Sequence, residues 1–129
     1  MKRLFLDVDT GHDDAFALLL AVYHPDSDLL GVTTVAGNQT VAKTAHNSRR
    51  MLTLIGKGHV PVVAGCSEPL SHSLRICDEI HGSSGLDGAD WTAIDALITE
   101  HTPPSPFMAI SFMYNTLKSA FEEQKERFT

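Results

Sequence analysis

The chain lacks several features that would point to particular protein classes. It has 129 residues, with two cysteines, one tryptophan and 7% aromatic residues. Cys66 and Cys77 are too few and too far apart for a structural zinc site, and we expect reduced thiols in a cytoplasmic protein. The short apolar run after Lys2 and Arg3 is interrupted at Asp7, which predicts neither a signal peptide nor a membrane anchor.

Basic residues are also scarce. Ten Lys and Arg residues stand against sixteen Asp and Glu residues, which gives a formal net charge of −6. The basic residues are scattered, so the sequence argues against a broad surface for nucleic acid or for an anionic membrane. The composition, 43% hydrophobic and 20% charged, is that of one globular domain with a packed core.

Negative charge, by contrast, is concentrated near the start of the chain. Asp7, Asp9, Asp13 and Asp14 fall within eight residues, between two apolar stretches. Helix capping could account for Asp13 or Asp14, but it does not account for Asp7 and Asp9 at the end of a strand. Because carboxylates are hard ligands, the cluster predicts a Ca²⁺ or Mg²⁺ site rather than a zinc site.

The apolar pattern alternates between strands and helices. Residues 3–8, 29–36 and 60–64 read as buried strands, and residues 13–24 and 40–55 read as helices. In the first helix, Phe16, Leu19, Leu20 and Tyr23 recur at helical spacing. This order predicts an α/β fold, an open parallel sheet with helices on both faces.

The loops after the three strands should meet at one edge of that sheet. Asp9 follows the first strand, Asn38 the second and Gly65 the third. In open parallel sheets, ligands bind beyond the carboxyl ends of the strands. The aspartates and the Gly37-Asn38 turn should therefore share one crevice.

The second half of the chain is less regular. Residues 65–90 form a long polar loop, residues 91–101 resemble a helix, and residues 107–113 could be a strand or the start of a last helix. Residues 115–128 are amphipathic and predict a helix. We therefore expect residues 1–101 to form the main unit and residues 102–129 a divergent, helical C-terminal tail.

Four segments in order resemble the inosine-uridine-preferring nucleoside hydrolases. The segments are 7–15 (DVDTGHDDA), 31–40 (GVTTVAGNQT), 61–65 (PVVAG) and 80–86 (IHGSSGL). The resemblance implies a nucleoside hydrolase fold, Ca²⁺ as cofactor, and cleavage of a ribonucleoside by water into free base and ribose.

The resemblance also implies roles for individual residues. Asp9 and Asp14 would hold Ca²⁺, and Asp9 would also take a proton from the attacking water. Asp13 and Asn38 would grip the ribose hydroxyls. By the same resemblance, the role of His81 would be catalytic, near the base or over the ribose, and Asp7 would be a supporting residue that orients the loop.

Other interpretations remain open. Taken alone, Asn38 fits a turn residue and His81 fits a surface histidine. A haloacid-dehalogenase-type phosphotransferase also begins with Asp-x-Asp, but it places Thr one position later than Thr10 and gives Asp13 and Asp14 no role.

The sequence also departs from the resembled family. Family members are more than twice as long, and we recognise none of their later segments here. The chain alone is therefore expected to be weakly active or inactive. The alternative function is that of a non-catalytic relative that binds metal or ribose, or that associates with a full-length copy. The sequence leaves base preference and homo-oligomer formation open.

Overall fold

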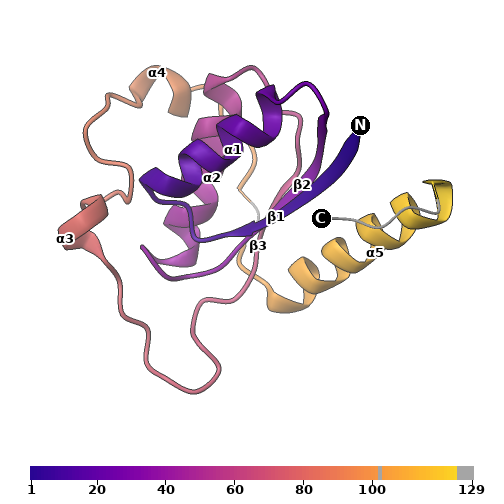
Figure 1. Ribbon diagram of the computed structural model, residues 1–129. Coiled ribbons are helices and arrows are strands. Elements are labelled where there is room, and N and C mark those ends of the chain that lie inside the picture. The colour runs from indigo at the N-terminus through magenta and orange to yellow at the C-terminus, as the bar shows by residue number, and fades with distance from the viewer. Residues whose placement is uncertain (102, 125–129) are drawn as a thin grey trace.

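The computed structural model describes residues 1–101 and 103–124 and contains a parallel three-stranded sheet (Figure 1). The strands are β1 (Lys2–Val8), β2 (Ser27–Thr34) and β3 (Val62–Ala64), in the spatial order β1-β2-β3. Val8 pairs with Thr34, and Thr34 pairs with Ala64. The carboxyl ends of the three strands are therefore level, and the loops that follow them leave from one edge, as predicted.

Helices cover both faces of this sheet, which confirms the predicted fold class. α1 (His12–Tyr23) and α2 (Val41–Leu54) lie together on one face, and α5 (Pro106–Gln124) crosses the other face (Figure 1). Between the helices and the sheet, Leu18, Val32 and Leu52 are almost completely buried and belong to one apolar core. Burial of such side chains is the main stabilising contribution to the fold.

The apolar residues that predict α1 do not form its buried side. Phe16, Leu20 and Tyr23 are each more than 60% exposed, whereas the buried residues of the helix are Ala15, Leu18 and Ala21. Because α1 is apolar around most of its circumference, periodicity identifies the helix but cannot tell which side packs on the sheet.

The second half of the chain differs from prediction in two places, and the structure decides a third that the sequence left open. The expected long loop contains the short helix α3 (Asp78–His81), and the helix expected over residues 91–101 is limited to α4 (Thr92–Asp95). The ambiguous segment 107–113 is helical, because α5 begins at Pro106. Ser105 accepts a hydrogen bond from the Met108 N–H, and proline is favoured at a first helical position. The expected helical residues 125–128 lie outside the described residues.

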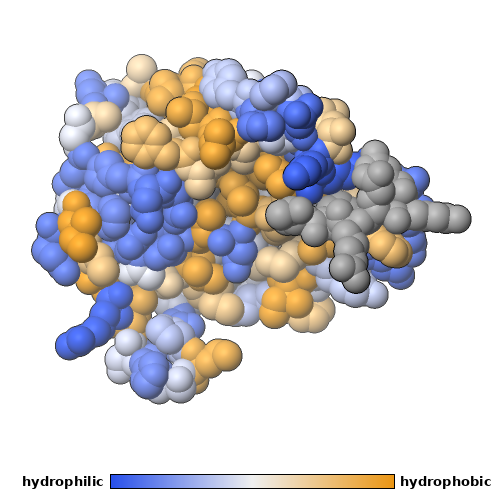
Figure 2. Space-filling model, in the orientation of Figure 1, coloured by the Kyte–Doolittle hydropathy of each residue, from blue (hydrophilic) through white to orange (hydrophobic). Residues whose placement is uncertain are grey.

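Apolar side chains also reach the surface. Figure 2 shows hydrophobic residues spread across one face of the molecule between hydrophilic residues. On α5, Phe107, Ile110 and Tyr114 are each more than 60% exposed. Within residues 1–101 and 103–124, no helix has the length and apolar character needed to cross a membrane.

Candidate active site

Asp9 is the centre of the candidate site. It follows β1 directly, and one of its carboxylate oxygens accepts the backbone N–H of Asn38 at 2.8 Å. The Asn38 side-chain amide donates to the Asp9 carbonyl at 3.1 Å, and the Asp9 N–H donates to the Asp14 carboxylate at 3.2 Å. The loops after β1 and β2 and the first turn of α1 are therefore joined through one residue, as the strand order predicts.

Two glycines allow this close approach. A Cβ atom on Gly37 would overlap the Asp9 carboxylate. A Cβ atom on Gly11 would lie 2.8 Å from both the Asn38 amide nitrogen and the His81 ring. Gly11 therefore marks the point at which the aspartate loop, the Asn38 turn and His81 come together. Since real Cβ atoms do not approach other atoms so closely, a larger residue at either position would force the Asp9, Asn38 or His81 side chain to shift.

The acidic groups repel one another electrostatically. The pKa of Asp14 is raised from 3.8 to about 6, first by burial of its carboxylate and then by the negative charges of Asp13 and Asp9. The helix dipole at the start of α1 favours negative charge there, but it does not offset this repulsion. A bound cation would offset the repulsion between these carboxylates, although it would not remove the effect of burial.

His12 is a site residue that the sequence did not reveal. Its ring stacks on the ring of His81, and one hydrogen bond joins the two Nδ1 atoms at 3.0 Å. The His12 Nε2 atom donates to the Asp87 carbonyl at 2.9 Å. No ligand spacing in the sequence relates His12 to His81, because the contact links α1 to the end of α3, about 70 residues later.

Buried polar side chains form hydrogen bonds to the loops that carry the site residues. Asn47 is completely buried on α2, and its amide donates to the carbonyls of Thr10 and Ser84 at 3.3 and 2.8 Å. The Thr10 hydroxyl bonds to Ser48 at 2.6 Å, and Gln39 donates to the Gly82 carbonyl at 3.2 Å. A buried carbonyl group needs a hydrogen-bond donor. Because these side chains supply the donors, they fix the positions of the aspartate loop and of the segment that contains His81.

The other two candidate residues lie at the margin of this cluster. Asp13 is exposed in the first turn of α1, beside Asp14. Asp7 lies within β1, where its carboxylate accepts the Thr33 hydroxyl from β2 at 2.7 Å. The structure therefore brings Asp9, Asp14, Asn38 and His81 together. Asp13 lies beside them, and the Asp7 carboxylate is engaged within the sheet.

The donors of this site suit Ca²⁺ in kind but not in number. Asp9 and Asp14 offer carboxylate oxygens, the ligands that Ca²⁺ prefers, but Ca²⁺ takes about six to eight oxygens. Across the described ranges 1–101 and 103–124, no group of three or more His, Cys, Asp or Glu side chains could hold a metal ion. Two clustered carboxylates are thus fewer ligands than Ca²⁺ takes.

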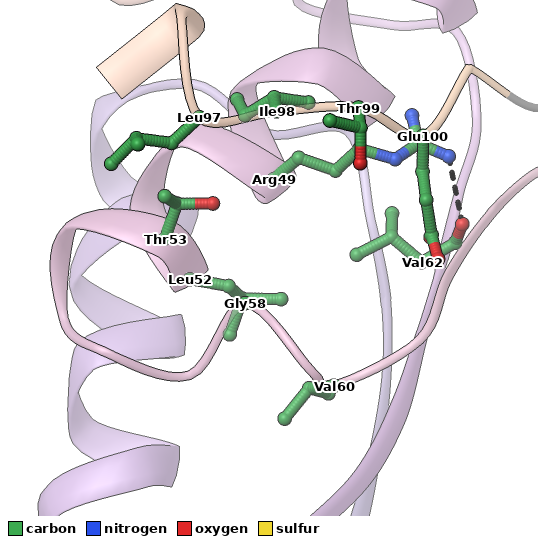
Figure 3. A pocket seen from close by; sticks show the side chains of 10 residues that line it. All are labelled: Arg49, Leu52, Thr53, Gly58, Val60, Val62, Leu97, Ile98, Thr99 and Glu100. Carbon is green, nitrogen blue, oxygen red and sulfur yellow. Dashed lines mark hydrogen bonds between the residues drawn. The ribbon is translucent and has the colours of Figure 1, made fainter. Parts of the chain in front are cut away.

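A separate cavity of about 220 Å³ lies beside the start of β3 (Figure 3). Arg49 enters it from α2 and donates to the Val62 carbonyl at 2.9 Å. Burial lowers the pKa of Arg49, and the negative charge of Glu100 opposes that change. None of the candidate site residues lines this cavity, so we assign it to packing of the 97–100 segment rather than to the active site.

A family model described as "Inosine-uridine preferring nucleoside hydrolase" matches residues 4–128. The chain belongs to this family. Two similar relatives are pyrimidine-specific ribonucleoside hydrolases named RihA. The protein from Photobacterium profundum is 44% identical over 121 residues, 94% of this chain and 37% of that protein. The protein from Shewanella baltica strain OS155 is 53% identical over 87 residues, 67% of this chain and 27% of that protein.

Solved nucleoside hydrolases share the fold. An inosine-guanosine nucleoside hydrolase superposes with a TM-score of 0.72 at 25% identity, over 91% of this chain and 33% of that one. The plant nucleoside hydrolase PpNRh1 gives a TM-score of 0.68 at 31% identity, over 79% of this chain and 31% of that one. The chain therefore spans about a third of the length of the nucleoside hydrolases that it matches.

Proposed function

We propose that this chain carries part of the active site of a ribonucleoside hydrolase, which cleaves the N-glycosidic bond to give free base and ribose. The observation that carries the proposal is the convergence of Asp9, Asp14, Asn38 and His81 beyond the carboxyl ends of the strands. Family membership supports the same reaction class. The acidic, oxygen-rich site suits a neutral sugar and a hard cation.

In this proposal, each residue has a chemical task. Asp9 and Asp14 would hold Ca²⁺, which when bound would favour deprotonation of an adjacent water. Asp9 is the base that accepts the proton from that water, and its position is fixed by the Asn38 N–H. Asp13 and the Asn38 amide would accept and donate hydrogen bonds at the ribose hydroxyls. These interactions would stabilise the positive charge that develops on the ribose ring.

His81 would lie at the base side of the site, and Asp7 would support the sheet end that carries Asp9. The relatives named RihA are pyrimidine-specific, whereas the solved structures include an inosine-guanosine enzyme. We therefore propose uridine as the first substrate to test and inosine as the second. We also propose a cytoplasmic location, supported by the two free cysteines.

A second function is favoured by the incomplete donor set. A non-catalytic relative would bind metal or ribose, or associate with a full-length hydrolase, without turnover. The described residues offer two clustered carboxylate ligands, and the chain covers 37% of the Photobacterium relative. For this reason we expect little or no hydrolysis by the 129-residue chain alone.

Calcium titration by calorimetry, paired with a uridine and inosine hydrolysis assay, tests both functions. We expect weak Ca²⁺ binding that is lost in Asp9→Ala and kept in the control Asp26→Asn, an exposed carboxylate remote from the cluster. Metal binding without turnover supports the non-catalytic alternative. Robust turnover that Asp9→Ala abolishes would refute the expected inactivity. Absence of both metal and nucleoside binding would refute the site itself.

A further inference from the structure

His12 and His81 meet at the candidate site through the same ring atom. Their Nδ1 atoms are 3.0 Å apart, and the ring centroids are 5.3 Å apart with the ring planes inclined by 19°. The two distances differ by about two ring radii, so the Nδ1 atoms point toward each other along the line that joins the rings. In a hydrogen bond of this kind, one Nδ1 atom carries the proton and the other accepts it.

The Asp87 carbonyl determines which of the two atoms carries the proton. A carbonyl oxygen only accepts, so the His12 Nε2 atom, 2.9 Å away, donates its proton there. A neutral imidazole carries one ring proton. The Nδ1 atom of a neutral His12 is therefore an acceptor, and the proton between the two rings belongs to the His81 Nδ1 atom. The His81 Nε2 atom is then left without a proton.

The Asp87 carbonyl is held in place by contacts that do not involve His12. Asp87 closes a turn that begins at His81, because its N–H donates to the His81 carbonyl at 3.2 Å and its carboxylate accepts the Ser84 N–H at 3.0 Å. Buried Asn47 also donates to the Ser84 carbonyl at 2.8 Å. The turn thus fixes the acceptor that faces His12, and the hydrogen bonds of His12 transmit this constraint to the His81 ring.

One further contact competes for the His81 Nδ1 atom. The His12 backbone N–H points at it from 3.3 Å, which would require a lone pair there. Two neutral rings cannot keep this contact together with both shorter ones. Its loss costs little, because an N–H in the first turn of a helix can bond to water and His12 is exposed. Loss of the Asp87 bond would instead set two lone pairs 2.9 Å apart. A doubly protonated His12 would keep all three contacts, so this proton arrangement is that of the two neutral rings.

We propose that His12 is a positioning residue for His81, which holds the neutral His81 ring in its Nδ1–H form. The His81 Nε2 atom is then a hydrogen-bond acceptor, and no hydrogen bond within residues 1–101 and 103–124 engages it. The adjoining Cε1 atom lies 2.8 Å from the position of a Gly11 Cβ, and so does the Asn38 amide nitrogen. The free acceptor therefore belongs to the candidate site.

Under the proposed function, on which this step rests, the tautomer sets how His81 meets a nucleoside. A neutral ring with its lone pair on Nε2 accepts a hydrogen bond from a sugar hydroxyl or from an N–H group of the base. In this form the ring has no Nε2 proton to give to the departing base. His81 would therefore orient the nucleoside rather than act as a general acid.

Long-range proton–nitrogen NMR spectra of the histidine rings test the proposal on the chain without metal or nucleoside. At about pH 9, where histidine side chains are neutral, we expect the ring proton on Nδ1 of His81 and on Nε2 of His12. His12→Phe keeps a ring and removes both nitrogens. In this variant the His81 proton should move to Nε2, because Nδ1 then accepts the backbone N–H at position 12. His12→Asn offers an oxygen near the place of Nδ1 and should keep the Nδ1–H form.

The control is His72→Phe, a substitution at an exposed histidine in the loop after β3, which should leave the His81 spectrum unchanged. Because His12 is exposed, its variants should fold, and the backbone amide spectrum verifies this. A wild-type His81 with its proton on Nε2 would overturn the proposal, and so would an Nδ1–H form that persists in His12→Phe. These spectra do not require hydrolysis, so failure of the proposed function and failure of this proposal are distinguished.

Discussion

Replacement of Asp14 by Asn should stabilise the chain while it abolishes metal binding. Asp14 has a pKa of about 6 in the folded chain, against an ordinary value of 3.8, because its carboxylate is partly buried beside Asp13 and Asp9. The folded chain therefore binds this proton more tightly than the unfolded chain does. The ionised Asp14 carboxylate therefore destabilises the folded chain. The free energy of unfolding falls as the pH rises from about 3.8 to about 6, and the full decrease in stability is present above pH 6.

The size of the effect follows from the same values. A pKa of about 6 instead of 3.8 corresponds to about 3 kcal/mol, at about 1.36 kcal/mol per pH unit. Because the Asp14 carboxylate is partly exposed, solvent screening reduces this to about 1–1.5 kcal/mol. The amide oxygen that Asp14→Asn introduces can still accept the hydrogen bond from the Asp9 N–H, so the substitution removes the charge and keeps the contact.

Urea unfolding in EDTA at pH 4 and at pH 7.5 measures this prediction. Asp14→Asn should raise the free energy of unfolding by about 1–1.5 kcal/mol at pH 7.5 and by much less at pH 4. With millimolar Ca²⁺ at pH 7.5, the wild-type chain should gain stability and the variant should not. Asp26→Asn is the matched control and should change little at either pH. A variant that is less stable at pH 7.5, or equally shifted at both pH values, would refute the reasoning.

Two further predictions concern the support of the site. Gly37→Ala places a Cβ atom against the Asp9 carboxylate and should cost about 1–3 kcal/mol of unfolding free energy and weaken Ca²⁺ binding in calorimetry; unchanged binding would contradict the close approach. Asn47→Ala leaves the carbonyls of Thr10 and Ser84 without their amide donor and should cost about 2–3 kcal/mol in urea unfolding. Ser83→Ala, an exposed neighbour, should cost far less.

Much of the fold and of the acidic site follows from local sequence. Alternating apolar segments predict the strands and the first two helices to within about three residues. The placement of Asp9 and Asn38 after successive parallel strands predicts that they meet, because such loops share one sheet edge. The prediction fails in the 91–101 segment, which contains a helix of only four residues. The sequence left the 107–113 segment open between a strand and the start of a helix, and the structure shows the helix.

Features that depend on packing between distant segments were decided only by the tertiary structure. It buried Leu18 rather than Phe16, since an all-round apolar helix has no preferred face until it meets a sheet. It brought His12 against His81, and it placed Asp7 in a hydrogen bond with Thr33 inside the sheet. The sequence by itself determined that negative charge gathers after β1. Only the folded surroundings, through burial and neighbouring carboxylates, raised the pKa of Asp14 and made that charge costly.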